Sequence, residues 1–181
     1  MVGNLMNNNL KAISSERLSG HNFLVFIEII RGSKKKYELD EETGCLILDR
    51  YLNTAFCYPA NYGFIPLTLC DDNDPLDVFV LTQEILDPMV LVECRPIGVI
   101  RMLDNGQQDD KIIAIPVKDL MLRQYINLSD IPKSWLLEIE HFLLHYKDLE
   151  NKVIQIQQIQ DFQEAVSVVE KALSKYKLIS V

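Results

Sequence analysis

The stretch Asp71-Asp72-Asn73-Asp74-Pro75-Leu76-Asp77-Val78 places four carboxylates within seven residues and leads into an apolar run that ends at Leu81. Pro75 fixes its own φ and disfavours helical geometry at Asp74, so the sequence predicts a shaped turn at the start of a strand. Carboxylates this close repel one another, and a hard cation such as Mg²⁺ or Ca²⁺ relieves that repulsion. The turn is therefore a candidate metal platform, and a solvated acidic loop is the alternative.

The residues before this turn read as strands joined by short turns. Residues 23–30 are β-branched and aromatic and predict a buried strand, in which Glu28 is the one charge. A carboxylate there needs a partner or an opening onto a site. Residues 36–39 alternate, which puts Lys36 and Glu38 on one face of a strand, and residues 40–44 predict a hairpin turn before a strand at 45–50. Tyr58 and Tyr62 fall in an aromatic loop at 56–64, either as core side chains or as parts of a specified turn.

A second acidic loop follows the first at residues 104–111. It lies between a long β-type run at 90–103, which Pro96 and Gly98 should bend, and a strand at 112–117. If the sheet curls, the two acidic loops face one another across its mouth. Neighbouring strands would then supply Glu28, Lys36, Glu38 and Arg50.

Two amphipathic helices are predicted near the C-terminus, separated by a strand at 153–159. Pro132 opens the first helix, and Asp161 starts the second. Their core-facing stripes comprise Trp135, Ile139, Phe142, Tyr146 and Leu149, and then Phe162, Ala165, Val166, Val169, Ala172, Leu173 and Tyr176. His141 and His145 are four residues apart, which is metal-ligand spacing without a third ligand; a surface or subunit contact is the favoured interpretation.

Composition predicts a single globular domain over residues 1–181, with residues 1–20 as a partly ordered arm. The net charge of -8 excludes a whole-chain basic footprint for nucleic acid. No apolar run has the length of a membrane span or of a signal-peptide core, so a cytoplasmic protein without membrane partners is expected. Four cysteines without C-x-x-C spacing, each among apolar residues, predict buried free thiols.

The polar inventory indicates metal-assisted phosphoryl transfer, because carboxylates hold divalent metals while Lys, Arg and Tyr hold phosphate oxygens. The sequence has no Gly-rich phosphate loop and no dinucleotide fingerprint, which favours a small, highly charged phosphate substrate over a nucleotide.

Residues 72–78 also match the signature D-[SGDN]-D-[PE]-x-D-x of the soluble family I inorganic pyrophosphatases, and the chain resembles the bacterial type of that family. The resemblance runs in order from Phe26 to the last helix. Its other matching segments are residues 27–29, 36–38, 49–50, 58–63, 95–99 and 145–150. The chain departs from bacterial members at Ile30, where they carry proline, in the turn at residues 31–33, and at Val153, where tryptophan is common. These changes leave the chemistry intact and bear on loop geometry and subunit contacts.

The resemblance implies a closed, five-stranded β-barrel of OB type with flanking α-helices, an α+β fold with a mainly β core. It implies Mg²⁺-dependent hydrolysis of inorganic pyrophosphate to two orthophosphates, an inorganic diphosphatase activity, by a cytoplasmic homo-oligomer that is usually a hexamer in bacteria. It further implies several Mg²⁺ ions in each active site, with Mn²⁺ or Zn²⁺ as alternatives and Ca²⁺ as an inhibitor.

The resemblance also assigns roles to individual residues. Asp72, Asp77 and Asp109 resemble the ligands of the tightest metal, with Asp77 bridging to a second; Asp104 and Asp109 resemble the ligands of a metal that arrives with substrate. Glu28 resembles an additional metal contact, Asp74 matches the general base, and Glu38 and Tyr58 belong to the same pocket. The phosphate contacts would be Lys36, Arg50, Tyr62, Lys111, Tyr146 and Lys147.

Two alternatives remain open. One is an oligonucleotide-binding OB module with a structural Ca²⁺ in the acidic turn, which the net charge and the acidic rim disfavour. The other is a catalytically inactive relative kept for assembly, which the complete set of acidic and basic residues disfavours.

Overall fold

The computed structural model describes residues 10–40, 42–150 and 152–179. The expected N-terminal arm lies partly outside this range. The described elements, in chain order, are η1 (Ser15–Arg17), β1 (Phe23–Ile29), β2 (Lys35–Leu39), β3 (Leu46–Tyr51), β4 (Asn61–Ile65), β5 (Leu76–Val80), β6 (Leu91–Asp104), β7 (Gln107–Gln108), β8 (Lys111–Pro116), η2 (Leu128–Asp130), α1 (Lys133–His145), η3 (Asp148–Glu150), β9 (Ile154–Asp161) and α2 (Phe162–Ile179).

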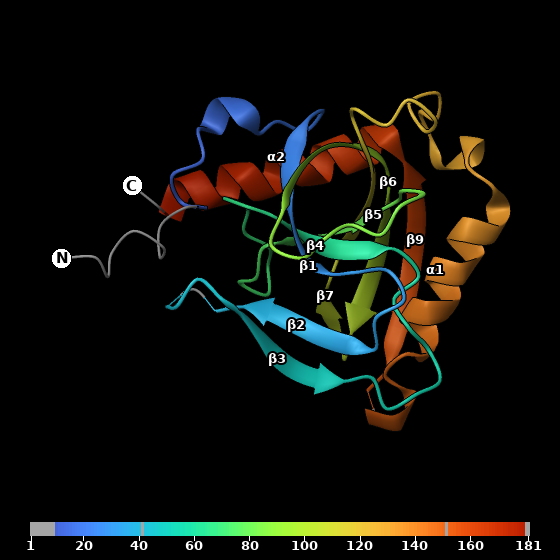
Figure 1. The fold of residues 1–181 in the computed structure, drawn as a ribbon. Helices are drawn as coiled ribbons and strands as arrows, with labels where there is room; N and C mark the ends of the chain where they lie inside the picture. Colours follow the sequence, from blue (N-terminus) through green and yellow to red (C-terminus); the bar gives the residue numbers. More distant parts are fainter. Residues whose placement is uncertain (1–9, 41, 151, 180–181) are drawn as a thin grey trace.

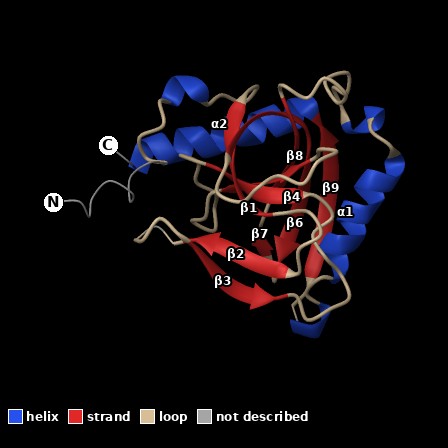
Figure 2. Cartoon of the chain, in the orientation of Figure 1, coloured by secondary structure: helices blue, strands red, loops and turns tan. Residues whose placement is uncertain are grey.

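A ring of strands forms the centre of the molecule (Figures 1 and 2). The strands pair in the order β1-β4-β5-β8-β6, and β6 pairs back to β1, so these five strands close a barrel. All of these pairings are antiparallel except β5 with β8, which is parallel. The expected closed barrel of OB type, with flanking helices, is therefore confirmed.

Strand β6 is long enough to serve several pairings. Its first half pairs with β1, its second half pairs with β9, and the register against β8 shifts between Pro96 and Gly98. The irregularity that these two residues predicted is confirmed. Gly63 of β4 marks another close approach, because an added Cβ would lie 1.8 Å from the carbonyl oxygen of Phe26 in β1. Only glycine allows the two strands to pair this closely.

Alternating side chains divide the core into two clusters. On β5, Val78 and Val80 join the cluster that includes residues of α2, whereas Phe79 joins the cluster that includes residues of α1. Strand β8 follows the same rule, since Ile113 faces the α1 cluster and Ile112 the α2 cluster. Any polar residue in phase with Phe79 or Ile113 therefore faces the α1 side.

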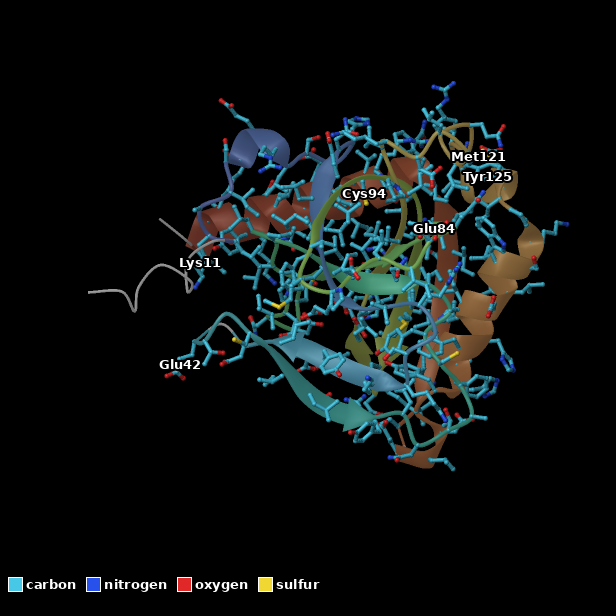
Figure 3. All side chains as sticks on the ribbon, in the orientation of Figure 1. Lys11, Glu42, Glu84, Cys94, Met121 and Tyr125 are labelled. Carbon is cyan, nitrogen blue, oxygen red and sulfur yellow. The ribbon has the colours of Figure 1, made fainter. Side chains whose placement is uncertain are left out.

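Strands β2 and β3 form a separate two-stranded antiparallel sheet. Figure 1 shows this hairpin beside the barrel, and Figure 3 shows Glu42 at its tip. The backbone N–H of Leu39, at the end of β2, donates to Oε1 of the buried Glu28 in β1 at 2.7 Å. Glu28 thus has the partner that its position in a buried strand required.

Several expectations about burial and loops are wrong. Residues 61–64, expected in a loop, form part of β4, and Lys111, expected in the second acidic loop, begins β8. Leu149 is exposed because α1 ends at His145, before the helical stripe can reach it.

The four cysteines are free, as expected, but their burial is not uniform. Cys94 is buried within the fold (Figure 3), whereas Cys45 and Cys57 are exposed because they lie outside the barrel strands, at the hairpin and in the β3–β4 connection. In the described part of the chain, no helix has the length and apolar character needed to cross a membrane.

Candidate active site

A polar cavity of about 250 Å³ lies where the two acidic loops meet the C-terminal end of α1. Its lining includes eleven of the predicted site residues: Lys36, Tyr58, Tyr62, Asp72, Asp74, Asp77, Asp104, Asp109, Lys111, Tyr146 and Lys147. The prediction that the two acidic loops face one another is confirmed. Gln107, Phe79, Phe142 and Leu143 complete the lining, and none of these had been predicted as a site residue.

Strand register brings the central residues of this cavity together. Asp77 pairs with Lys111 across the parallel β5–β8 ladder, and both are in phase with residues that face the α1 side. Tyr62 pairs with Phe79 across the β4–β5 ladder, and their rings meet edge to face with centroids 4.9 Å apart. Three strands therefore present a phenol, a carboxylate and an ammonium group to the same space.

Local hydrogen bonds shape the acidic turn that enters β5. The backbone N–H of Cys70 donates to the carbonyl of Asp74 at 2.8 Å, and the N–H of Asp74 donates to Oδ1 of Asp72 at 3.0 Å. Asn73 has a φ of 72°, a left-handed conformation that asparagine tolerates better than most residues. The N–H of Leu76 donates to Oγ1 of the buried Thr68 at 2.9 Å. The turn is thus closed on itself at one end and attached to the barrel at the other.

Two buried lysines neutralise the carboxylates around the cavity. The ammonium group of Lys111, only 4% exposed, pairs with Asp77 and Asp109. Burial would lower the pKa of Lys111, but the charges of Asp77 and Asp109 outweigh it and raise that pKa well above its usual value. Lys147, directly after α1, pairs with Asp104. Lys111 is therefore cationic, and ion pairs hold both ammonium groups in place.

A chain of aromatic rings supports one wall of the cavity. Tyr58 lies between Tyr62 and Phe142, at centroid distances of 5.3 Å and 4.9 Å, and Phe142 stacks on Tyr146 at 4.7 Å. Burial raises the pKa of all three tyrosines above the usual value, so each keeps its hydroxyl proton at neutral pH and can donate it to an anion. The same ring contacts therefore pack the core and position the tyrosines that line the cavity.

Two carboxyl groups of the cavity, those of Asp74 and Asp109, resist ionisation. Burial, followed by the charges of Asp72 and Asp77, raises the pKa of Asp74 above its usual value. Burial also raises the pKa of Asp109, with Asp77 adding to the effect and Lys111 opposing it. Burial is the main cause of both shifts, and the repulsion between neighbouring carboxylates that the sequence predicted adds to it.

A second cavity, of about 690 Å³, shares Lys36, Tyr62, Asp74 and Asp77 with the first. Glu28 and Glu38 line this larger cavity and not the smaller one. Burial, followed by the charge of Asp77, raises the pKa of Glu28 to about 8. The two glutamates therefore lie next to the polar cavity instead of within it.

The hairpin residues Lys36 and Arg50 are held by acidic neighbours. Lys36 pairs with Glu38, which confirms that both lie on one face of β2, and its Nζ is also 3.2 Å from Oδ2 of Asp49. Arg50 pairs with Asp49, and its Nε donates to Oε1 of Glu150 at 3.0 Å. Arg50 lines neither cavity. Sequence reasoning assigned Asp49 and Glu150 no role, because Asp49 contacts Lys36 of another strand and Glu150 contacts Arg50 from a hundred residues away.

The donors around the polar cavity fit hard divalent cations. They are carboxylate oxygens, which Mg²⁺ and Ca²⁺ prefer. Among the described residues, no three acidic, histidine or cysteine side chains already converge at metal-binding spacing, and the ammonium groups of Lys111 and Lys147 contact the carboxylates instead. However, Oδ1 of Asp104 is buried and has no hydrogen-bond partner within the described ranges. A cation would supply that partner, so these residues fit a metal.

The two histidines of α1 lie outside this site. The rings of His141 and His145 are 4.7 Å apart, and Phe56 packs against His141 at 5.2 Å. Nδ1 of His145 lies 3.0 Å from Oδ2 of Asp148. No third metal ligand joins them among the residues that the structure describes. Their role as a surface or subunit contact stays a prediction.

Comparison with known proteins agrees with this geometry. A family model described as inorganic pyrophosphatase matches residues 25–177. The chain is 46% identical over 151 residues to soluble inorganic pyrophosphatase 2 of Chlamydomonas reinhardtii, covering 83% of this chain and 79% of that protein. It is 42% identical over 154 residues to soluble inorganic pyrophosphatase 1 of Arabidopsis thaliana, covering 85% of this chain and 73% of that protein. The solved inorganic pyrophosphatase of Thermus thermophilus superposes with a TM-score of 0.88 at 37% identity, covering 93% of this chain and 99% of the other. The chain therefore belongs to the soluble inorganic pyrophosphatases of family I.

Proposed function

We propose that this protein hydrolyses inorganic pyrophosphate to two orthophosphates with the help of Mg²⁺. The observation that carries the proposal is one cavity lined by carboxylates from both acidic loops together with buried ammonium and phenol groups. Carboxylates suit divalent cations, and ammonium and phenol groups suit phosphate oxygens, so the lining matches both halves of a metal–pyrophosphate complex.

Lysine and tyrosine side chains bind the substrate in this proposal. Lys111 and Lys147 are buried cations beside the tyrosine rings, with Nζ of Lys147 5.1 Å from the centroid of Tyr146. The contacts of Lys36 with Glu38 and Asp49 hold its ammonium group in the lining of the same cavity. Together with the tyrosine hydroxyls these groups orient pyrophosphate and neutralise charge on the leaving phosphate. Arg50, which pairs with Asp49 and Glu150 outside both cavities, is proposed as a further phosphate contact.

The carboxylates divide into metal ligands and a proton acceptor. Asp72, Asp77, Asp104 and Asp109 would hold Mg²⁺, with Glu28 as a further contact from the adjoining cavity. When bound, Mg²⁺ polarises phosphate oxygens and lowers the pKa of water. Asp74 lines both cavities, and its raised pKa suits a group that accepts a proton from the attacking water.

The proposal extends to conditions and assembly. Mn²⁺ or Zn²⁺ can replace Mg²⁺, whereas Ca²⁺ inhibits because its larger, looser coordination misplaces the water. The protein works as a homo-oligomer, a hexamer, in the cytoplasm. Exposed apolar side chains on α1, including Leu137 and Leu144, support a contact between subunits on that helix.

Phosphate release from pyrophosphate, measured with and without Mg²⁺, tests the proposed reaction. Turnover that requires Mg²⁺ and is lost in Lys111→Met would support it, because that variant removes a buried phosphate contact. Lys118→Met, which changes the same charge on the exposed loop after β8, is the matched control. No phosphate release by the wild type, together with tight binding of single-stranded oligonucleotides, would overturn the proposal in favour of a binding module.

A further inference from the structure

Helix α2 contacts the acidic turn through one lysine. Nζ of Lys175 donates to the carbonyl of Cys70 at 2.7 Å and to Oδ1 of Asp71 at 2.8 Å. The same helix also accepts a hydrogen bond from the segment just before the turn: the N–H of Leu69 donates to the carbonyl of Ala172 at 3.1 Å. Lys175 lines neither cavity. Lys175 therefore reaches the turn from outside both cavities.

The Cys70 peptide is the point at which this turn closes. Its N–H donates to the carbonyl of Asp74 at 2.8 Å, and its carbonyl also accepts from the N–H of Asn73 at 3.3 Å. Lys175 thus holds a residue whose donor and acceptor both define the turn. A hydrogen bond from a charged donor to this carbonyl restricts the backbone between Cys70 and Asp74. Asp72, which lines the polar cavity, lies in that restricted segment.

Lys175 also offsets a charge next to the predicted metal ligands. Asp71 precedes Asp72 directly, and like charges this close disfavour a compact turn. The neighbouring Lys171 contributes less, because its Nζ is 3.7 Å from Oδ2 of Asp71 and its side chain is 71% exposed. Exposed ion pairs of that kind stabilise a fold weakly. Lys175, at 31% exposed and with a backbone contact, differs from Lys171 in geometry but not in charge.

We propose that Lys175 is a positioning residue for the active site: through Cys70 and Asp71 it holds the acidic turn in the conformation that binds the metal. Its consequence for catalysis rests on the proposed function, whereas its effect on the turn does not. In other metal sites, residues that orient the ligands by hydrogen bonds without touching the metal have a similar role. Losing such a residue weakens metal affinity by about 10–100-fold.

The test compares Lys175→Met, Lys175→Arg and Lys171→Met in the full chain. Hydrogen exchange of the metal-free protein is followed at residues 69–76 and, as an internal reference, in β8. Mg²⁺ affinity is measured by calorimetry without pyrophosphate. We expect Lys175→Met to accelerate exchange of the turn but not of β8, and to weaken Mg²⁺ binding about tenfold. Lys175→Arg retains a donor and should recover most of the affinity, and Lys171→Met should stay within about twofold of the wild type.

Three results would overturn the inference. The first is equal behaviour of Lys175→Met and Lys171→Met, since charge alone would then account for both. The second is exchange that rises equally in the turn and in β8, which would indicate general destabilisation. The third is faster turn exchange with unchanged Mg²⁺ affinity. Phosphate release by the wild type is measured in parallel, and its failure would refute the proposed reaction while the exchange comparison still decides the role of Lys175 in the turn.

Discussion

Glu28→Gln should change how the stability of the metal-free protein depends on pH. Glu28 is 7% exposed in β1, and burial followed by the charge of Asp77 raises its pKa from 4.5 to about 8. Glutamine has the same shape and keeps a carbonyl that can accept from the N–H of Leu39, but it cannot ionise. The substitution therefore removes the titration and retains the hydrogen bond to the hairpin.

The sign and size of the effect follow from the two pKa values. Between pH 4.5 and 8, folded Glu28 retains a proton that the unfolded chain has lost, so its contribution to stability is complete below pH 4.5 and is lost as pH rises to 8. The whole shift corresponds to on the order of 5 kcal/mol, and about 2.5 kcal/mol of it falls between pH 6 and pH 9. Glu28→Gln should therefore gain about 2.5 kcal/mol relative to the wild type across that interval.

Urea unfolding at one protomer concentration, with a metal chelator present, measures this difference at pH 6 and pH 9. Other titrating groups are common to both proteins and cancel in the comparison. A difference between wild type and variant that is the same at both pH values would refute the reasoning. Asp77→Asn in the wild-type background should shrink the pH effect, because it removes the second cause of the shift.

Asp74→Asn should lower turnover about a hundredfold, the scale of general-base loss, while calorimetry finds Mg²⁺ affinity largely intact; full recovery in excess Mg²⁺ would make Asp74 a ligand instead. Asp77→Asn should weaken Mg²⁺ affinity and turnover together, and normal Mg²⁺ binding would contradict its role as a bridge. Mg²⁺ binding should release protons and weaken as pH falls, because the pKa values of Asp74 and Asp109 are raised; calorimetry in buffers of different ionisation heat measures this release. Replacing both His141 and His145 by alanine should favour smaller species, because it removes two side chains from the proposed subunit contact; light scattering measures the mass. An unchanged mass would mean that these histidines do not control assembly.

The sequence determined the features that depend on neighbouring residues. Pro75 and the carboxylates around it predicted a shaped acidic turn, and alternation predicted that Lys36 and Glu38 share a face of β2, as their ion pair confirms. Pro96 and Gly98 predicted the irregularity in β6. These predictions held because backbone restriction and side-chain period act over a few residues, whatever the rest of the fold does.

Burial could not be determined in this way. Cys45 and Cys57 sit among apolar residues in the sequence, yet both are exposed. Leu149 fits the period of α1, but the helix ends before reaching it. The spacing of apolar residues in the sequence assigns a residue to one face of a helix or strand. Whether that residue is buried depends on whether another element covers that face.

Only the tertiary structure decided which distant residues meet. The parallel register of β5 and β8 places Lys111 against Asp77, 34 residues away, and thereby forms the centre of the polar cavity. The pairing of Arg50 with Glu150 spans 100 residues, and the contact of Lys175 with Cys70 spans 105. No local pattern encodes such contacts, because they depend on barrel closure and on how two helices pack against it. The sequence thus specified the chemical groups of the site, and the closed barrel determined their positions relative to one another.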